Sequence, residues 1–358
     1  MDGVLAREQR AGQLLRFISK GWSWLFLLVL LTFFSLTGGN FFSFTNLQNM
    51  LTNMAFVLLL ALGQTFVIIL GGLDLSTGYI MGLSSVVSAL IIATLGSKFA
   101  FPLIVLLGIA GGIAAGCLPG LLNGLIIARF SVPPFIVTLG MLGIAQGTGY
   151  ILAHGVPVSI PLQGLDRVSS LYLLYLLPDG HFTLLSLPSN MTSYALRHTT
   201  GILPLQLVVC VFAVLLCHWL LAYTRFGQHT YAIGGNRRAA VRAGIPLARH
   251  TIVIYLLSAL LAACAGILFM LRYTSGSTDA GQPMLIDSVA AVAIGGASLF
   301  GGEGTMIGTL IGTLIIAVIQ SGLIFLNIDP FWQYIAIGVI IIVAVFIDQA
   351  KTRVLRQR

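Results

Sequence analysis

Charged residues are scarce in this chain. Of its 358 residues only 8% are Asp, Glu, Lys or Arg, whereas 58% are hydrophobic. Ordinary soluble domains carry about 25% charged residues, and no soluble core could hide so much apolar surface from water. The short alternating segments of a membrane β-barrel are absent as well. The composition therefore predicts an all-α polytopic membrane protein.

Motifs for redox, metal or nucleotide chemistry are also lacking. The four cysteines lie in apolar runs without a C-x-x-C pair, and the six histidines show no metal spacing such as H-E-x-x-H. We interpret the cysteines as small buried hydrophobic residues. The three lysines do not follow glycines, and G-x-x-x-x-G-K-[ST] does not occur. We therefore expect no catalytic residues, no metal and no cofactor bound by this chain.

Long apolar runs are what the chain does contain. One crossing of a bilayer needs about 20 predominantly apolar residues, which predicts about ten transmembrane helices with broken or re-entrant segments. The candidate spans are 22–37, 49–70, 75–95, 101–128, 133–153, 201–222, 250–271, 284–300, 304–326 and 330–347. The span 284–300 can also be interpreted as re-entrant. The first span follows a basic segment but lacks an A-x-A cleavage site, so we expect it to be retained.

The distribution of basic residues predicts the orientation. With the N-terminus in the cytoplasm, 14 of the 18 Lys and Arg residues fall on the cytoplasmic side, which obeys the positive-inside rule. An even number of spans places the C-terminus on the same side. The net charge of +8 is then a consequence of topology, and we expect no nucleic-acid partner.

Two long segments lie between spans. The outer segment 154–200 contains several prolines and the run "LYLLYLLP", which is too short to cross a bilayer and is expected at the interface or on the outer face. The inner segment 224–250 is basic. In it, Gly234 and Gly235 are expected to break the chain, Asn236 to cap a short helix "RRAAVRAG", and Gly244 to end that helix. This pattern fits either a basic loop or a docking helix for a cytoplasmic partner.

The stretch "GGLDLSTG" holds the only charged residue between 61 and 91, Asp74. Gly71 and Gly72 permit a sharp turn. Asp74 can cap the next helix by accepting N–H groups near Ser76 and Thr77, or it can line the solute path or meet a moving element.

A second glycine-rich stretch allows another sharp turn. Its glycines before the ninth span are Gly295, Gly296, Gly301 and Gly302. The spacing of Gly304, Gly308 and Gly312 suits close helix packing, and a hinge is the alternative. "GGLDLSTG" and "GGASLFGG" align at an offset of 224, which suggests a two-fold repeat only weakly, because a second pair of segments aligns at 198.

These stretches carry a family resemblance. The loop matches the pattern T-x-F-G-x-x-x-Y-A-x-G-G-N-x-x-A-A-x-x-x-G-I, and 61–91, 132–140 and 290–316 match three further patches in order. The matching loop residues are Thr224, Phe226, Gly227, Tyr231, Ala232, Gly234, Gly235, Asn236, Ala239, Ala240, Gly244 and Ile245. The chain resembles permease subunits of ATP-binding-cassette importers, in the branch that includes the ribose permease.

The resemblance implies one permease domain, 1–358, in the bacterial inner membrane. It implies that separate ATPase subunits bind ATP and Mg and pull on the loop around Arg237–Gly244. Two permease chains, identical or related, would form the pore, and a periplasmic binding protein would meet 154–200. This segment is longer than the family leads us to expect, so the receptor and solute stay open.

The relatives in this branch imply a monosaccharide such as ribose, or a polyol, as the solute. A nucleoside, an amino acid or an autoinducer-like sugar is the alternative within the same machinery. An ion-coupled secondary transporter is the alternative from another class, and it would use Asp74, Asp287 and Glu303. Polar residues within the spans could face the path or bond helix to helix: Gln64, Asn123, Thr138 and Gln146.

Overall fold

The computed structural model describes residues 23–96, 98–165, 168, 171–184, 199–329, 331–339 and 342–343. In these ranges the chain is mostly helical, and seven helices are long and apolar enough to cross a membrane. They are α2 (Phe44–Ile69), α3 (Thr77–Leu95), α4 (Phe101–Phe130), α5 (Pro134–Ala153), α8 (Leu205–Tyr223), α11 (Leu247–Tyr273) and α13 (Met306–Phe325). The prediction of a polytopic helical membrane protein is confirmed at this level.

The count of ten spans is not reproduced among the described residues. The helix Ser23–Thr37 and α12 (Gln282–Ile294) are apolar but shorter. With 13 residues, α12 extends for only about 20 Å at 1.5 Å per residue, less than the hydrocarbon thickness of about 30 Å. Residues 331–339 are helical, while part of the tenth candidate span lies outside the described residues.

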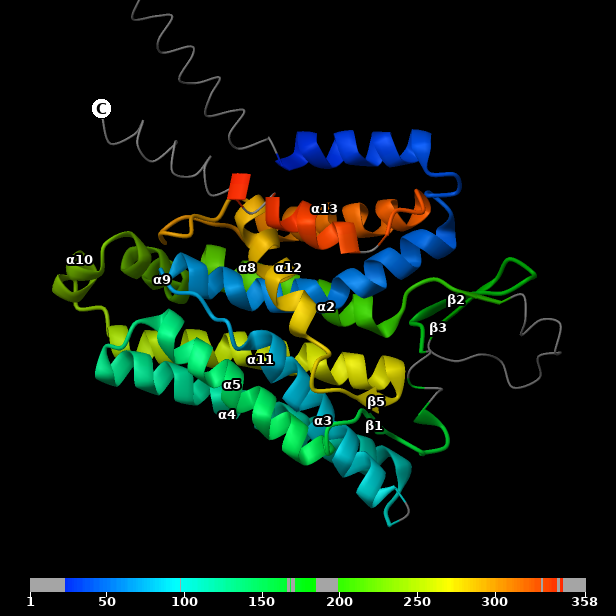
Figure 1. The fold of residues 1–358 in the computed structure, drawn as a ribbon, viewed down its shortest axis with the longest axis horizontal. Helices are drawn as coiled ribbons and strands as arrows, with labels where there is room; N and C mark the ends of the chain where they lie inside the picture. Colours follow the sequence, from blue (N-terminus) through cyan, green and yellow to red (C-terminus); the bar gives the residue numbers. More distant parts are fainter. Residues whose placement is uncertain are drawn as a thin grey trace, which may run out of the picture.

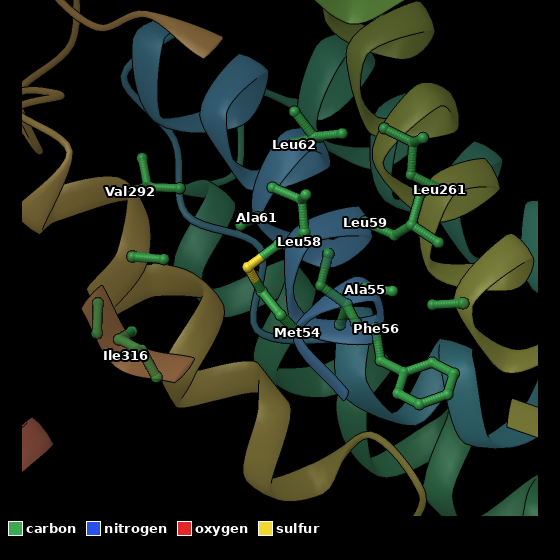
Figure 2. Packing of buried hydrophobic residues seen from close by; sticks show 14 of the residues in the cluster. Met54, Ala55, Phe56, Leu58, Leu59, Ala61, Leu62, Leu261, Val292 and Ile316 are labelled. Carbon is green, nitrogen blue, oxygen red and sulfur yellow. The ribbon is translucent and has the colours of Figure 1, made fainter. Parts of the chain in front are cut away.

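Helix α2 lies at the centre of the helical body. Its most apolar window is 94% buried, because α8, α11, α12 and α13 all pack against it. Figure 2 shows α2 side chains such as Met54 and Leu58 among Leu261 of α11, Val292 of α12 and Ile316 of α13. A helix that is apolar on every side is stable in this position because protein covers it all round.

A row of glycines lets α4 approach two neighbours closely. The row repeats every four residues: Gly108, Gly112, Gly116, Gly120 and Gly124. A Cβ at Gly112 would lie 3.0 Å from a backbone oxygen of α3, and one at Gly124 would lie 2.7 Å from the Cα of Ile252 in α11. Small residues allow backbones in membranes to touch in this way. This spacing of four residues is visible in the sequence, but the close contacts of α4 were not predicted from it.

Short strands, which were not predicted, accompany the helices at the outer segment and after α11. β1 (Val158–Ser159) pairs antiparallel with β5 (Ser275–Gly276). A three-stranded sheet has the order β3–β2–β4, with β2 (Leu174–Leu176) between β3 (Phe182–Leu184) and β4 (Thr200–Gly201). Part of "LYLLYLLP" is a strand, because β2 pairs with β3 on one side and with β4 on the other.

The connections lie at opposite ends of the helical body. The short helices α9 (Arg225–Gly235) and α10 (Arg237–Arg242) lie at one end, and the strands lie at the other (Figure 1). The outer segment and the inner loop of the sequence analysis are thus separated by the length of the spans. Which of the two ends faces the cytoplasm stays a prediction.

Candidate coupling region and membrane breaks

Two side-chain caps shape the loop between α8 and α11. Thr224 accepts the N–H of Gly227 through its Oγ1 at 3.4 Å and so begins α9. Asn236 accepts the N–H of Ala239 through its Oδ1 at 3.0 Å and so begins α10. Each cap satisfies a backbone donor that a helix leaves free at its start. The capped helix after Asn236 is confirmed.

The end of α10 is confirmed as well, whereas the break before it differs from the prediction. Gly244 adopts a left-handed φ of +78°, which suits glycine after a helix. Gly234 and Gly235 belong to the last turn of α9, and the chain breaks one residue later, at the extended Asn236. Close contact with the carbonyl of Ile69 explains the glycine at 234, whereas a Cβ at Gly235 would meet no other atom within 4 Å.

Five glycines from three separate segments meet at one place, which we call the glycine junction: Gly71, Gly234, Gly235, Gly301 and Gly302. The N–H of Gly302 donates to the carbonyl of Ile69 at 2.8 Å. A Cβ at Gly234 would overlap that carbonyl oxygen, and one at Gly302 would lie 2.9 Å from the Cα of Gly235. The junction thus joins the ends of α2 and α9 to the loop before α13 through backbone atoms.

Tyr231 adds a second bond between α9 and that loop. Its hydroxyl donates to the carbonyl of Gly304 at 2.6 Å. Burial raises the pKa of Tyr231 above its ordinary value of 10.0, so the hydroxyl keeps its proton and remains a donor at neutral pH. Tyr231 belongs to the loop pattern, but the pattern does not reveal this partner 73 residues away.

The exposed face of α10 combines apolar and basic side chains. Val241 is 58% exposed, and Ala239, Arg237, Arg238 and Arg242 are exposed beside it. Ala240, in contrast, is buried. The outward face of α10 is therefore free of other described parts of the chain.

Asp74 lies in a non-helical connection between α2 and α3 and is fully buried. Its Oδ1 accepts the N–H of Ser76 at 3.0 Å and the Ser76 hydroxyl at 2.6 Å. Its Oδ2 accepts the hydroxyl of Ser258, in α11, at 3.3 Å. Of the two expected backbone donors, Ser76 is observed; the N–H of Thr77 is not seen bonding to Asp74. The carboxyl group joins the start of α3 to α11.

Three of the four polar residues named from the spans hold this connection. Gln64 of α2 donates to the carbonyl of Asp74 at 2.6 Å, and Asn123 of α4 donates to the Ser76 hydroxyl at 2.9 Å. Thr138 of α5 donates to the carbonyl of Leu73 at 3.1 Å. Their observed role is bonding between helices, which prevents unpaired backbone groups inside the membrane.

Both glycine pairs end a helix in the same way. Gly71 and Gly296 have φ of +87°. The N–H groups of Gly71 and Gly72 donate to Ile68 and Val67, and those of Gly296 and Ala297 donate to Ala293 and Val292. This is the Schellman arrangement of a helix C-terminus. The two stretches therefore share a local stop signal, although it is displaced by one residue from their alignment at an offset of 224.

Close packing is confirmed for the second glycine stretch. A Cβ at Gly308 would overlap the carbonyl of Gly295, and one at Gly312 would overlap the carbonyl of Ala291. A Cβ at Gly304, by contrast, would lie 2.9 Å from side-chain atoms of Ala297 and Ile69. Helices α12 and α13 therefore touch along their backbones.

The other carboxyl groups are dispersed. Asp287 of α12 accepts from Gln320 of α13 at 2.9 Å, while Glu303 belongs to the loop before α13. Among the described residues, groups of His, Cys, Asp and Glu that could hold a metal ion are not found. Cys210 and Cys217 are buried, and Cys117 and Cys264 are partly buried.

Comparison with known proteins identifies the family. Residues 46–345 match the family model described as "Branched-chain amino acid transport system / permease component". The chain is 36% identical to the fructose import permease protein FrcC of Rhizobium meliloti over 90% of this chain and 82% of that protein. It is 35% identical to the ribose import permease protein RbsC of Bacillus subtilis over 92% and 91%. It is 36% identical to the galactose/methyl galactoside import permease protein MglC of Escherichia coli over 94% and 96%.

The chain therefore belongs to this family of ATP-binding-cassette importer permeases, in the ribose and monosaccharide branch. It is a multi-pass protein of the bacterial inner membrane; a 34% identical relative from Escherichia coli is named an inner membrane permease. No solved structure matches the chain.

Proposed function

We propose that this chain is the pore subunit of an ATP-driven importer that moves a monosaccharide, or a related neutral polyol, into the cytoplasm. The observation that carries the proposal is the similarity over most of the chain to permeases named for fructose, ribose and galactose. The whole chain would act as one permease domain. Alternating access would be driven by subunits that this chain does not contain.

Separate ATPase subunits would supply the energy, since the chain lacks a phosphate-binding loop. The exposed face of α10 is the proposed docking surface, because it presents Val241 and three arginines outward. A pull on α10 would reach α2 and the loop before α13 through the glycine junction. The residues 224–250 thus form the proposed coupling segment.

A periplasmic binding protein would deliver the solute at the opposite end, where 154–200 lies with its strands. A second permease chain, identical or related, would complete the pore, with lipid around the pair.

A zwitterionic amino acid, which the family description names, is less well suited to the membrane part of this chain. Its carboxylate would call for a cationic side chain or for the N-terminus of a broken helix. Helices α3, α5 and α12 and the segment 274–281 contain no Lys or Arg. A neutral solute does not need such a partner.

The decisive experiment is a pull-down of the neighbouring ATPase by the detergent-solubilised permease, followed by sugar uptake in vesicles. We would compare the wild-type chain with Ala239→Glu/Val241→Glu, because both side chains are exposed on α10. Ala240 is left intact because it is buried. The matched control is Ala100→Glu, an exposed alanine before α4 at the other end.

We expect the α10 variant to lose the ATPase and sugar uptake, while the control keeps both. Size-exclusion profiles would verify that all three proteins are folded. If the wild-type chain binds no ATPase and takes up sugar in response to a proton gradient, the proposal is wrong and ion-coupled transport replaces it.

A further inference from the structure

A second polar group lies on α3, α5 and the segment 274–281. Tyr150 donates through its hydroxyl to both carboxyl oxygens of Asp279, at 2.6 and 2.7 Å. Gln146 donates through its Nε2 to the Tyr79 hydroxyl at 3.1 Å. We call Tyr79, Gln146, Tyr150 and Asp279 the Asp279 group. Only Gln146 was noted from the sequence.

This group lies at membrane depth, beside a non-helical segment. Beyond β5 the chain runs down along α3: a Cβ at Gly82 would overlap the carbonyl of Thr278, and one at Gly78 would meet Gly281. Gly82 is 13 residues from the outer end of α3 at Leu95, or about 20 Å at 1.5 Å per residue. Asp279 therefore lies well below the outer ends of the spans.

Non-helical backbone at this depth is tolerated where protein buries it or where it lines a water-filled cavity. One side of the segment 274–281 is buried, because Ser277 bonds through both its N–H and its carbonyl to the Ser85 hydroxyl at 3.1 Å. The other side carries Asp279, which is partly exposed along with Tyr150 and Gln146. A carboxyl group open to lipid would be costly, so this side faces water or polar groups.

The face of α5 next to this group is not covered by other described parts of the chain. Its glycines Gly140, Gly143 and Gly147 are exposed, and a Cβ at any of them would have no atom within 4 Å. On the helix, Gln146 and Tyr150 flank these positions at spacings of three and four residues. The Asp279 group thus borders an open surface on which these glycines lie among exposed apolar side chains such as Leu139 and Ile151.

We propose that the Asp279 group is a solute-contacting site in the translocation path and that it takes a neutral polyhydroxyl solute. The group offers carboxyl acceptors, amide and phenol donors and two aromatic rings. A carboxylate has about four acceptor positions, and the two oxygens of Asp279 share the single hydroxyl proton of Tyr150. The remaining positions can accept sugar hydroxyl groups. This inference rests on the proposed function.

The test uses the permease reconstituted in vesicles with its ATPase and binding protein. Asp279→Asn and Tyr150→Phe are compared with Asp287→Asn, which changes a buried aspartate bonded to Gln320. We expect sugar uptake to fall at least tenfold for the two site variants, with ATPase assembly and basal ATP hydrolysis unchanged, and to stay within about twofold for the control.

Thiol labelling gives a readout that a structural role would not change. Gly147→Cys places a thiol in the open space beside the group, and Leu118→Cys places one on an exposed position of α4. Labelling of the parent chain, with its four native cysteines, is the blank. We expect a water-soluble thiol reagent to modify Gly147→Cys, sugar-loaded receptor to slow this several-fold, and Leu118→Cys to stay unmodified.

The outcomes separate the two proposals. If the wild-type assembly moves no sugar, the proposed function fails. If the wild type moves sugar but Asp279→Asn behaves like Asp287→Asn, the inference is overturned. It is also overturned if Gly147→Cys is shielded from the reagent because it cross-links to a second permease chain.

Discussion

Asp74 and Asp279 both lie in non-helical segments next to α3, but their surroundings differ. Asp74 is fully buried, and it accepts hydrogen bonds from Ser76, just before α3, and from Ser258 of α11. Asp279 is partly exposed, and within the described part of the chain Tyr150 alone donates hydrogen bonds to its carboxyl group. The first arrangement holds helices together, whereas the second leaves acceptor positions open. The same residue type thus serves structure in one break and is available for binding in the other.

The largest expected effect is the loss of folding when a side chain is added at the close contact between α4 and α11. Gly124→Leu places a side chain where even a Cβ lies 2.7 Å from the backbone of Ile252. Because α4 and α11 cannot both stay in place, we expect no folded protein on size-exclusion chromatography. Gly143→Leu, on the open face of α5, is the matched change and should yield folded protein. Equal loss of folding in both variants would contradict the distinction between the packed glycines of α4 and the exposed glycines of α5.

Removing the two carboxyl groups is the next test. Asp74→Ala leaves the buried Ser76 and Ser258 hydroxyls without their acceptor, and a buried donor left unsatisfied costs about 1–3 kcal/mol. We expect a clearly lower melting temperature in detergent for Asp74→Ala. Asp279→Ala should melt close to the wild type while sugar uptake is lost. If Asp279→Ala is the less stable variant, the assignment of roles is reversed.

The glycine junction also contains one closely packed glycine, Gly234, next to one with open space, Gly235. A Cβ at Gly234 would overlap the carbonyl of Ile69, whereas one at Gly235 has no atom within 4 Å. We expect Gly234→Ala to displace α9 and to reduce sugar-stimulated ATP hydrolysis several-fold, while Gly235→Ala stays near wild type. A normal ATPase assay for Gly234→Ala would show that the close contact is not needed for coupling.

The smallest effect is expected at the start of α10. Asn236→Ala removes the cap of this helix, which costs about 1 kcal/mol, and Asn236→Asp keeps an acceptor. Because α10 has only six residues, the loss should appear locally, as faster amide hydrogen exchange at Ala239. The melting temperature of the whole protein should not change measurably.

The sequence was sufficient where the signal is local. Asn236 and Gly244 predict the start and the end of α10 by their own conformational preferences. Asp74 likewise bonds to a residue only two positions away. The approximate positions of the long spans followed from apolar length alone. In these cases the cause and the structure lie within a few residues of each other.

The rest depends on partners that are distant along the chain. The glycine junction joins positions near 71, 234 and 302. From the sequence, a pair of glycines indicates a turn, but it does not indicate which distant segment the glycines contact. Asp279 falls between two candidate spans, so it was not counted as a membrane residue. The strands have two or three residues each, too few to form a periodic pattern.

The glycine junction also determines how stiff the connection from α10 is. Side chains can absorb a displacement by changing rotamer, but backbone atoms in direct contact have no such freedom. The contacts of Gly234 and Gly302 with Ile69 are of this second kind. In the proposed coupling, a movement of α9 and α10 would therefore reach the central helix α2 with little loss, because backbone atoms carry it.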